Sequence, residues 1–246
     1  GHARAAVDLA AIVGVPGLRS QALSLLVTAS FVAGHGVDAD ALATAVELED
    51  PDGDATTWFR ACAVEAMIAA WTGELTRART LLVGVAQRMQ ARGTELDIIW
   101  AANHLSMVDV WLGRYPEAEA SARVAVQRAN LVGSRQLLIT AWNVDAEVAA
   151  RTGREDDARS AAGAAIAAVR ETGAQHLAIA PTATLGFLEL SLGDYQSALN
   201  VLEPLLARFD AGFGTEIVFG GHLPDAIESL VALGRSDEAE PLVAAL

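Results

Sequence analysis

Cys62 and His104 are the residues whose types could support nucleophilic catalysis. A thiolate attacks carbonyl groups when a histidine takes its proton and a third group orients that histidine. Both residues lie in the middle of segments with helical periodicity, whereas a nucleophile normally occupies a sharp turn or a helix end. The sequence offers no visible third group. We therefore expect a buried thiol and a histidine with a structural partner, and we predict that the chain is not an enzyme.

Metal and acid–base chemistry are also disfavoured. The histidines form no pair four residues apart and have no cysteine partner, so we predict no metal and no cofactor. Asp145 and Glu147 are two residues apart on an expected helix, where they point in directions about 200° apart and cannot cooperate. The run Glu155-Asp156-Asp157 opens a helix, where negative charge is favoured by the helix dipole.

The elements that carry these residues recur with a fixed period. Five segments share a turn glycine followed five residues later by alanine. A second series of glycines lies halfway between them, so that a glycine marks about every twentieth residue. Glycine at this spacing is typical of helix C-termini, where a left-handed residue closes the last turn. The first series is Gly73, Gly113, Gly153, Gly193 and Gly234, and the second is Gly53, Gly93, Gly133, Gly173 and the pair Gly212/Gly214, with Gly14 and Gly34 extending the grid.

Two helices per 40 residues, repeated along the chain, predict an all-α fold of stacked αα-hairpins with 12 or 13 helices. We expect one solenoid domain over residues 1–246, with an irregular break at 210–221. Pro181 falls inside an expected helix and should kink it, and Pro204 and Pro241 are expected to act in the same way. The expected helices span residues 3–13, 18–33, 38–49, 55–72, 75–91, 95–112, 115–131, 135–152, 155–172, 175–192, 195–209, 216–233 and 236–245.

Composition excludes several functions. The net charge is −14, and all 17 basic residues are scattered arginines, so we predict no nucleic-acid binding by this chain. No apolar run is long enough to span a membrane and no signal peptide is visible, so we expect a cytoplasmic protein. Both ends are apolar, whereas solenoids normally carry polar caps. We expect either a middle portion of a longer protein or ends that pair with a partner, including a second copy.

The stretch from Leu185-Gly186 through Leu192-Gly193-Asp194-Tyr195 to Ala198-Leu199 resembles the tetratricopeptide (TPR) signature, with a period of 40 instead of 34. Phrases such as WLGRYPEAEA and LGRSDEAEPLV make the chain similar to the sensor region of MalT-like regulators. Those are large bacterial ATPases of the LuxR family with a C-terminal DNA-binding domain. The resemblance implies a right-handed superhelix that senses a signal. The chain itself has no phosphate-binding loop, since the sequence lacks lysine.

In TPR-like arrays the first helix of each repeat lines the concave groove, and counting back from each turn glycine gives the residues that face it. Tryptophan, methionine, asparagine and arginine at these positions favour a ligand surface. We predict that the groove binds a small-molecule inducer or a peptide. The alternative function is a scaffold that binds only proteins. For the tryptophans, the alternative is that they merely pack between repeats. The predicted groove residues are Arg60, Met67, Trp71, Trp100, Asn103, Met107, Trp111, Thr140, Asn143, Glu147, Arg151 and Phe187.

Overall fold

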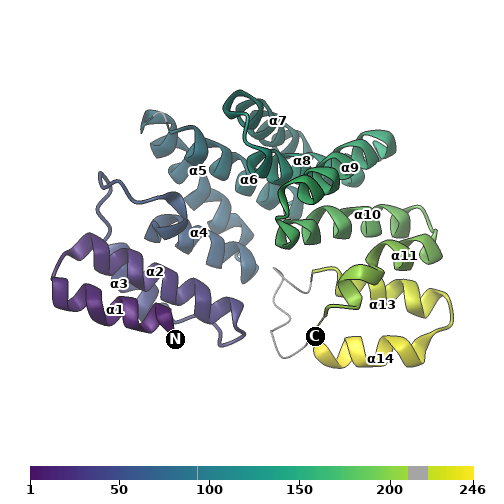
Figure 1. Ribbon diagram of the computed structural model, residues 1–246, viewed down its shortest axis with the longest axis horizontal. Coiled ribbons are helices and arrows are strands. Elements are labelled where there is room, and N and C mark those ends of the chain that lie inside the picture. The colour runs from purple at the N-terminus through teal and green to yellow at the C-terminus, as the bar shows by residue number, and fades with distance from the viewer. Residues whose placement is uncertain (93, 210–220) are drawn as a thin grey trace.

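The computed structural model describes residues 1–92, 94–209 and 221–246, and within them the chain is all-helical with no strand. The prediction of an α-helical solenoid is confirmed (Figure 1). The helices are α1 (His2–Val13), α2 (Pro16–Val32), α3 (Ala39–Glu47), α4 (Ala61–Trp71), α5 (Leu75–Arg92), α6 (Glu95–Trp111), α7 (Tyr115–Val132), α8 (Arg135–Arg151), α9 (Glu155–Thr172), α10 (Ile179–Ser191), α11 (Tyr195–Leu206), α13 (Leu223–Ala232) and α14 (Ser236–Ala245), with the 3₁₀ turns η1 (Thr57–Phe59) and η2 (Gln175–Ala178).

The five turn glycines of the repeat all adopt positive φ, between 71° and 84°, as their spacing predicts. Each closes the first helix of a hairpin in the same way. The backbone N–H of the residue after the glycine donates to the carbonyl five residues earlier, for example Arg114 to Asp109 at 2.7 Å and Asp194 to Glu189 at 3.0 Å. This bond satisfies a carbonyl that the helix end leaves free. The repeat in the sequence is therefore a repeated turn geometry.

The alanines that follow these glycines are buried, as expected from their size. Ala78, Ala118, Ala158 and Ala198 have no exposed surface, and Ala239 is 3% exposed. Small side chains here let the two helices of a hairpin approach closely, and the larger aliphatic residues then fill the space between successive hairpins. The core is accordingly a chain of small clusters along the solenoid.

At Gly186 two helices approach too closely for a side chain. A Cβ atom built on Gly186 would lie 2.5 Å from Leu202 Cδ2 and 2.6 Å from Leu202 Cγ. Leu202 has no exposed surface and lies on α11, the partner of α10. The Leu-Gly pair that carries the TPR resemblance thus acts by removing a side chain where two helices meet.

Ion pairs join successive repeats at equivalent positions. Arg79 Nε on α5 donates to the buried Asp109 of α6 at 2.5 Å. Arg159 on α9 forms the same pair with Glu189 of α10, with Nη2 and Oε2 3.2 Å apart. In both pairs the acid lies 30 residues after the arginine, four residues before the next turn glycine. These pairs fix the register of one hairpin on the next.

Three expectations about helix boundaries are wrong. The helix expected over 55–72 begins only at Ala61, because Thr57 bonds to Asp97 of the next repeat and Arg60 bonds to the Gly53 carbonyl at 2.5 Å. These bonds hold residues 53–60 as an irregular segment, and Gly53 lacks the positive φ expected of it. The helix expected from 175 begins at Ile179, after η2.

That late start also corrects the expectation for Pro181. Pro181 is the third residue of α10, where its missing N–H falls among the first-turn groups that have no intrahelical partner, so it does not interrupt a helix interior. Pro204 lies inside α11, which ends two residues later at Leu206, and Pro241 lies inside α14. Some expectations concern, wholly or in part, residues outside the described part of the chain. These are the break at 210–221, the start of the helix from 216, Gly93 and the pair Gly212/Gly214.

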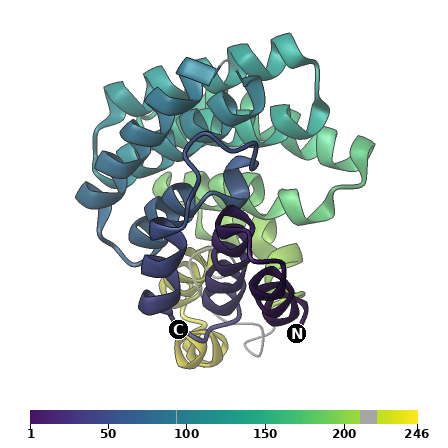
Figure 2. The same cartoon turned by 90° about the vertical axis from the view of Figure 1, so that its left-hand side faces the viewer.

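The hairpins follow one another along an arc, and the two chain ends lie on the same side of the molecule (Figures 1 and 2). The first helices α6, α8, α10 and α13 pack against one another in order, while α5, α7 and α9 lie on the outside of the arc (Figure 1). The first helices turn one surface toward the centre of the arc. We call this surface the inner face. Both ends expose apolar side chains, such as Ile12 and Leu246, so end-to-end association stays a prediction. None of the described helices has the length and apolarity needed to span a membrane.

Candidate functional site

The residues predicted to line the inner face recur every three or four residues on α6 and α8. Trp100, Asn103, Met107 and Trp111 follow this spacing on α6, and the spacing of 3.6 residues per turn places them on one side of the helix. On α8 the same pattern gives Thr140, Asn143, Glu147 and Arg151. The two rows meet, because Asn103 Nδ2 donates to Thr140 Oγ1 at 3.1 Å.

This contact fixes the orientation of the Asn103 amide. The Thr140 hydroxyl donates its only proton to the Leu137 carbonyl at 2.9 Å, so it can only accept from Asn103. The Asn103 nitrogen must therefore face Thr140, and Asn103 Oδ1 must point elsewhere. Asn103 is 9% exposed, and its Oδ1 finds no partner in the described residues.

Two further polar atoms of these helices are also buried without a hydrogen-bond partner among the described residues. Trp100 Nε1, which can only donate, and Asn143 Oδ1 are buried without a hydrogen-bond partner in the described part of the chain. Buried polar groups are nearly always paired, and each unpaired one costs about 1–3 kcal/mol. These helices thus contain one donor and two acceptors that no described group pairs with.

An aromatic cluster borders these atoms. The ring of His104 lies against Trp100, with centroids 4.0 Å apart, and Trp58 of η1 meets both rings edge-on at 6.1 Å and 6.0 Å. His104 Nδ1 donates to the Trp100 carbonyl at 2.7 Å, and burial lowers the pKa of His104 to about 4, so the ring is neutral at pH 7. Trp58 remains 60% exposed. Neither His104 nor Trp58 was predicted as a groove residue, although the spacing of Trp100 and His104 by four residues places them on one helix face.

A charged cluster lies further along the inner face, where α8, α10 and α13 meet. The Arg151 guanidinium lies 3.8 Å from the centroid of the Phe187 ring. Burial raises the pKa of Glu147, and Arg151 opposes this shift. Burial also raises the pKa of Asp225 to about 6, again against the effect of Arg151. Asp225 was not predicted, because it reaches this cluster from a repeat two hairpins away and no local pattern signals it.

Four of the predicted groove residues have other roles. Met67 is 5% exposed and belongs to the core between α4, α5 and α6, a cluster that also includes Trp100. Trp71 stacks on Phe31, with ring centroids 5.5 Å apart, and Trp111 packs between two core clusters. These tryptophans thus pack between repeats, which is the alternative that the sequence left open. Met107 is half-buried against the same core as Met67 and lies at the edge of the inner face.

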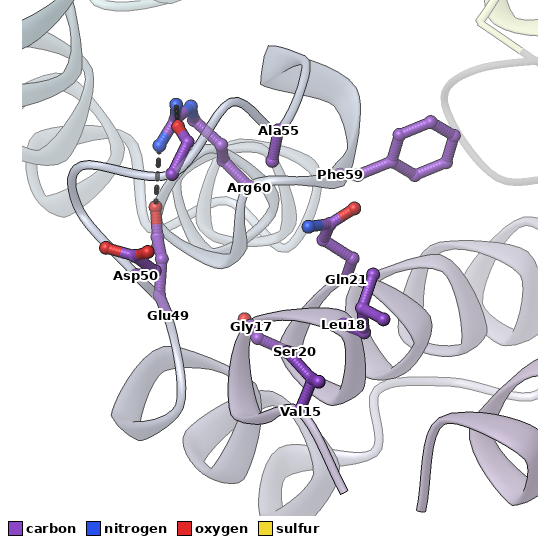
Figure 3. Close-up of a pocket in the computed structure, with 11 residues that line it drawn as sticks. Val15, Gly17, Leu18, Ser20, Gln21, Glu49, Asp50, Ala55, Phe59 and Arg60 are labelled. Atoms are coloured by element: carbon purple, nitrogen blue, oxygen red, sulfur yellow. Dashed lines mark hydrogen bonds and ion pairs between the residues drawn. The ribbon is translucent and has the colours of Figure 1, made fainter. Parts of the chain in front are cut away.

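Arg60 belongs to a separate pocket. It precedes α4 and is 4% exposed, and it lines a pocket of about 170 Å³ between α2 and residues 49–60 (Figure 3). Its Nη2 donates to the Gly53 carbonyl at 2.5 Å and its Nη1 lies 3.7 Å from Glu49 Oε1. The counting rule placed Arg60 on the inner face because it assumed that the helix begins before residue 60.

Cys62 and His104 interact with different neighbours. The Cys62 thiol donates to Glu49 Oε1 at 3.1 Å, and its backbone N–H donates to Oε2 at 2.7 Å. Burial and the Glu49 carboxylate raise the pKa of Cys62 to about 11, so the thiol is protonated and a poor nucleophile at pH 7. The Cys62 thiol and the His104 ring thus have separate partners, Glu49 and the Trp100 carbonyl.

The other acidic groups occupy different surroundings. The pKa of Asp145 responds, after burial, to Arg154 and Asp157, whereas that of Glu147 responds to Arg151, so the two carboxyls face different surroundings. Glu155, Asp156 and Asp157 form the first turn of α9. Among the described residues, no group of three histidine, cysteine or acidic side chains is placed to hold a metal ion.

Comparison with known proteins assigns no family to this arrangement. No protein-family model matches the chain, and no curated protein matches it either.

Proposed function

We propose that the inner face binds a small-molecule inducer or a peptide, and that the chain is the sensor region of a bacterial transcriptional regulator similar to the MalT-like group. The observation that carries the proposal is the set of buried, unpaired polar atoms on α6 and α8, led by Asn103 Oδ1 and Trp100 Nε1. A ligand with its own donors and acceptors recovers the free energy that these atoms lose on burial.

The contacts of the inner face also suggest how binding is relayed. Asn103 holds the α6 row to the α8 row through Thr140, and Arg151 joins α8 to Phe187 of α10. A ligand that pairs with Asn103 therefore changes the packing between two repeats. Because each repeat contacts its neighbours, a superhelix transmits such a change along its length. The regulator assignment is supported by the likeness of repeat phrases alone.

A ligand screen by thermal shift tests the proposal. Sugars, acyl compounds and short peptides are added to the chain, and a binder is expected to raise the melting temperature. The variants Asn103→Ala and Asn143→Ala are expected to weaken that binder. The matched control is Asn130→Ala on the outer helix α7, where Asn130 is exposed and bonds only to the Val126 carbonyl in the described residues.

The competing function is a protein–protein scaffold. It is favoured when no small molecule or peptide raises the melting temperature but a folded partner protein does. Reading the coding sequence on both sides of this chain separates the two further: a phosphate-binding loop upstream and a DNA-binding module downstream belong to the regulator.

A further inference from the structure

The pocket that contains Arg60 combines opposite charges with apolar walls. Arg60 is buried, and its Nε has no partner in the described residues. Glu49 and Asp50 lie beside it, and Leu18 and Phe59 contribute apolar surface (Figure 3). The pocket is separate from the inner face in its residues, although Phe59 directly follows Trp58 in the chain.

The charges disfavour ligands of a single sign. Two carboxylates and one guanidinium line the pocket, so a simple anion meets a net negative surface. A simple cation would leave the buried Arg60 Nε–H unpaired and would lie beside a positive charge. A ligand that carries one group of each sign avoids both costs.

The two carboxylates are not equivalent. Glu49 already accepts the Cys62 backbone N–H and thiol and faces Arg60. Asp50 is exposed and accepts the Asp52 backbone N–H through Oδ1, at 3.0 Å. An ammonium group entering from solvent therefore meets Asp50 first, while Arg60 supplies the positive charge of the pocket lining.

We propose that this pocket binds a free α-amino acid with an apolar side chain. The ligand's carboxylate pairs with Arg60, its ammonium pairs with Asp50, and its side chain lies against Leu18 and Phe59. The volume of about 170 Å³ is close to that of cavities that hold benzene-sized molecules, so it suits a ligand of roughly six to ten non-hydrogen atoms. This site is independent of ligand binding at the inner face.

Calorimetric titration with three matched compounds tests the charge pattern. Leucine carries both groups, 4-methylpentanoic acid lacks the ammonium, and 3-methylbutylamine lacks the carboxylate. Leucine, or another apolar amino acid from a full panel, is expected to bind at least about tenfold more tightly than its two analogues, since each analogue loses one charge-assisted contact. Equal binding of the three, or no binding of any apolar amino acid at millimolar concentration, overturns the proposal.

Variants then locate the site. Asp50→Asn is expected to weaken leucine about tenfold. Leu18→Trp, at a side chain that is 46% exposed, is expected to fill the pocket and abolish binding. The control is Asp40→Asn, an exposed acid in the first turn of α3 outside the pocket. Asn143→Ala on the inner face is also expected to leave leucine binding unchanged. Unchanged affinity in both Asp50→Asn and Leu18→Trp, with the fold retained, contradicts the assignment.

Discussion

Replacing Gly186 by alanine tests the packing of the repeat. The new Cβ would lie 2.5 Å from Leu202 Cδ2, and Leu202 is fully buried and cannot move away freely. Overpacking of a core costs about 1–3 kcal/mol, while the better helix propensity of alanine recovers about 1 kcal/mol. We expect a net loss of up to about 2 kcal/mol in the free energy of unfolding, measured by urea denaturation.

The chain contains a matched control for this substitution. Gly163 lies inside α9 and is exposed, and a Cβ added to it would meet no atom within 4 Å. Gly163→Ala is therefore expected to stabilise the protein by about 0.5–1 kcal/mol. Adding Leu202→Ala to Gly186→Ala should show favourable coupling, since the smaller side chain relieves the clash. If Gly186→Ala stabilised the chain as much as Gly163→Ala, the close approach of α10 and α11 would be refuted.

The charged groups lead to three further predictions. Because burial raises the folded pKa of Asp225 to about 6, its contribution to stability is present at low pH and is lost as the pH rises from about 4 to 6. Asp225→Asn should therefore gain up to about 1 kcal/mol over the wild type between pH 5 and 7.5 in urea titrations, after allowance for partial exposure, and parallel pH profiles would contradict this. His104 has the opposite sign: its folded pKa of about 4 lies below the ordinary value, so its contribution is present above about pH 6.5 and is lost as the pH falls toward 4. His104→Phe should therefore reduce, by about 2 kcal/mol, the stability that the protein loses between pH 6.5 and 5. An unchanged pH midpoint of acid unfolding would rule this out. Arg79→Ala should cost about 2–3 kcal/mol, because the buried Asp109 loses its 2.5 Å partner, whereas Arg123→Ala in an exposed pair should change the urea midpoint very little; equal effects would show that the pair is not structural.

The repeat and its turns could be predicted from the sequence because glycine is the residue that takes positive φ without strain. Gly113 and Gly193 lie where their spacing puts them, and each is followed by a buried alanine. This signal is local, so it needs no knowledge of the partner helix. The irregular segment before α4 escaped prediction because a long-range bond, from Thr57 to Asp97 forty residues away, holds it outside the helix.

The candidate site could be predicted only in part. The positions on α6 and α8 follow from helical spacing alone, and Asn103 and Thr140 meet as two neighbouring first helices require. Which of these side chains keeps a free polar atom depends on the hydrogen bonds of the folded chain. Asp225 joins Arg151 across two hairpins, and Trp58 comes from outside any α-helix, so neither has a local sequence signal.

The indole N–H resonance of Trp100 gives the most direct view of the inner face in solution. The chain is labelled with ¹⁵N at its tryptophan indoles and titrated with the best compound from the thermal-shift screen. Since Trp100 Nε1 has no acceptor in the described structure, we expect its signal to shift strongly on binding, while that of Trp71, stacked on Phe31, stays nearly unchanged. A bound compound that leaves the Trp100 resonance in place would contradict the assignment of the inner face as the binding surface.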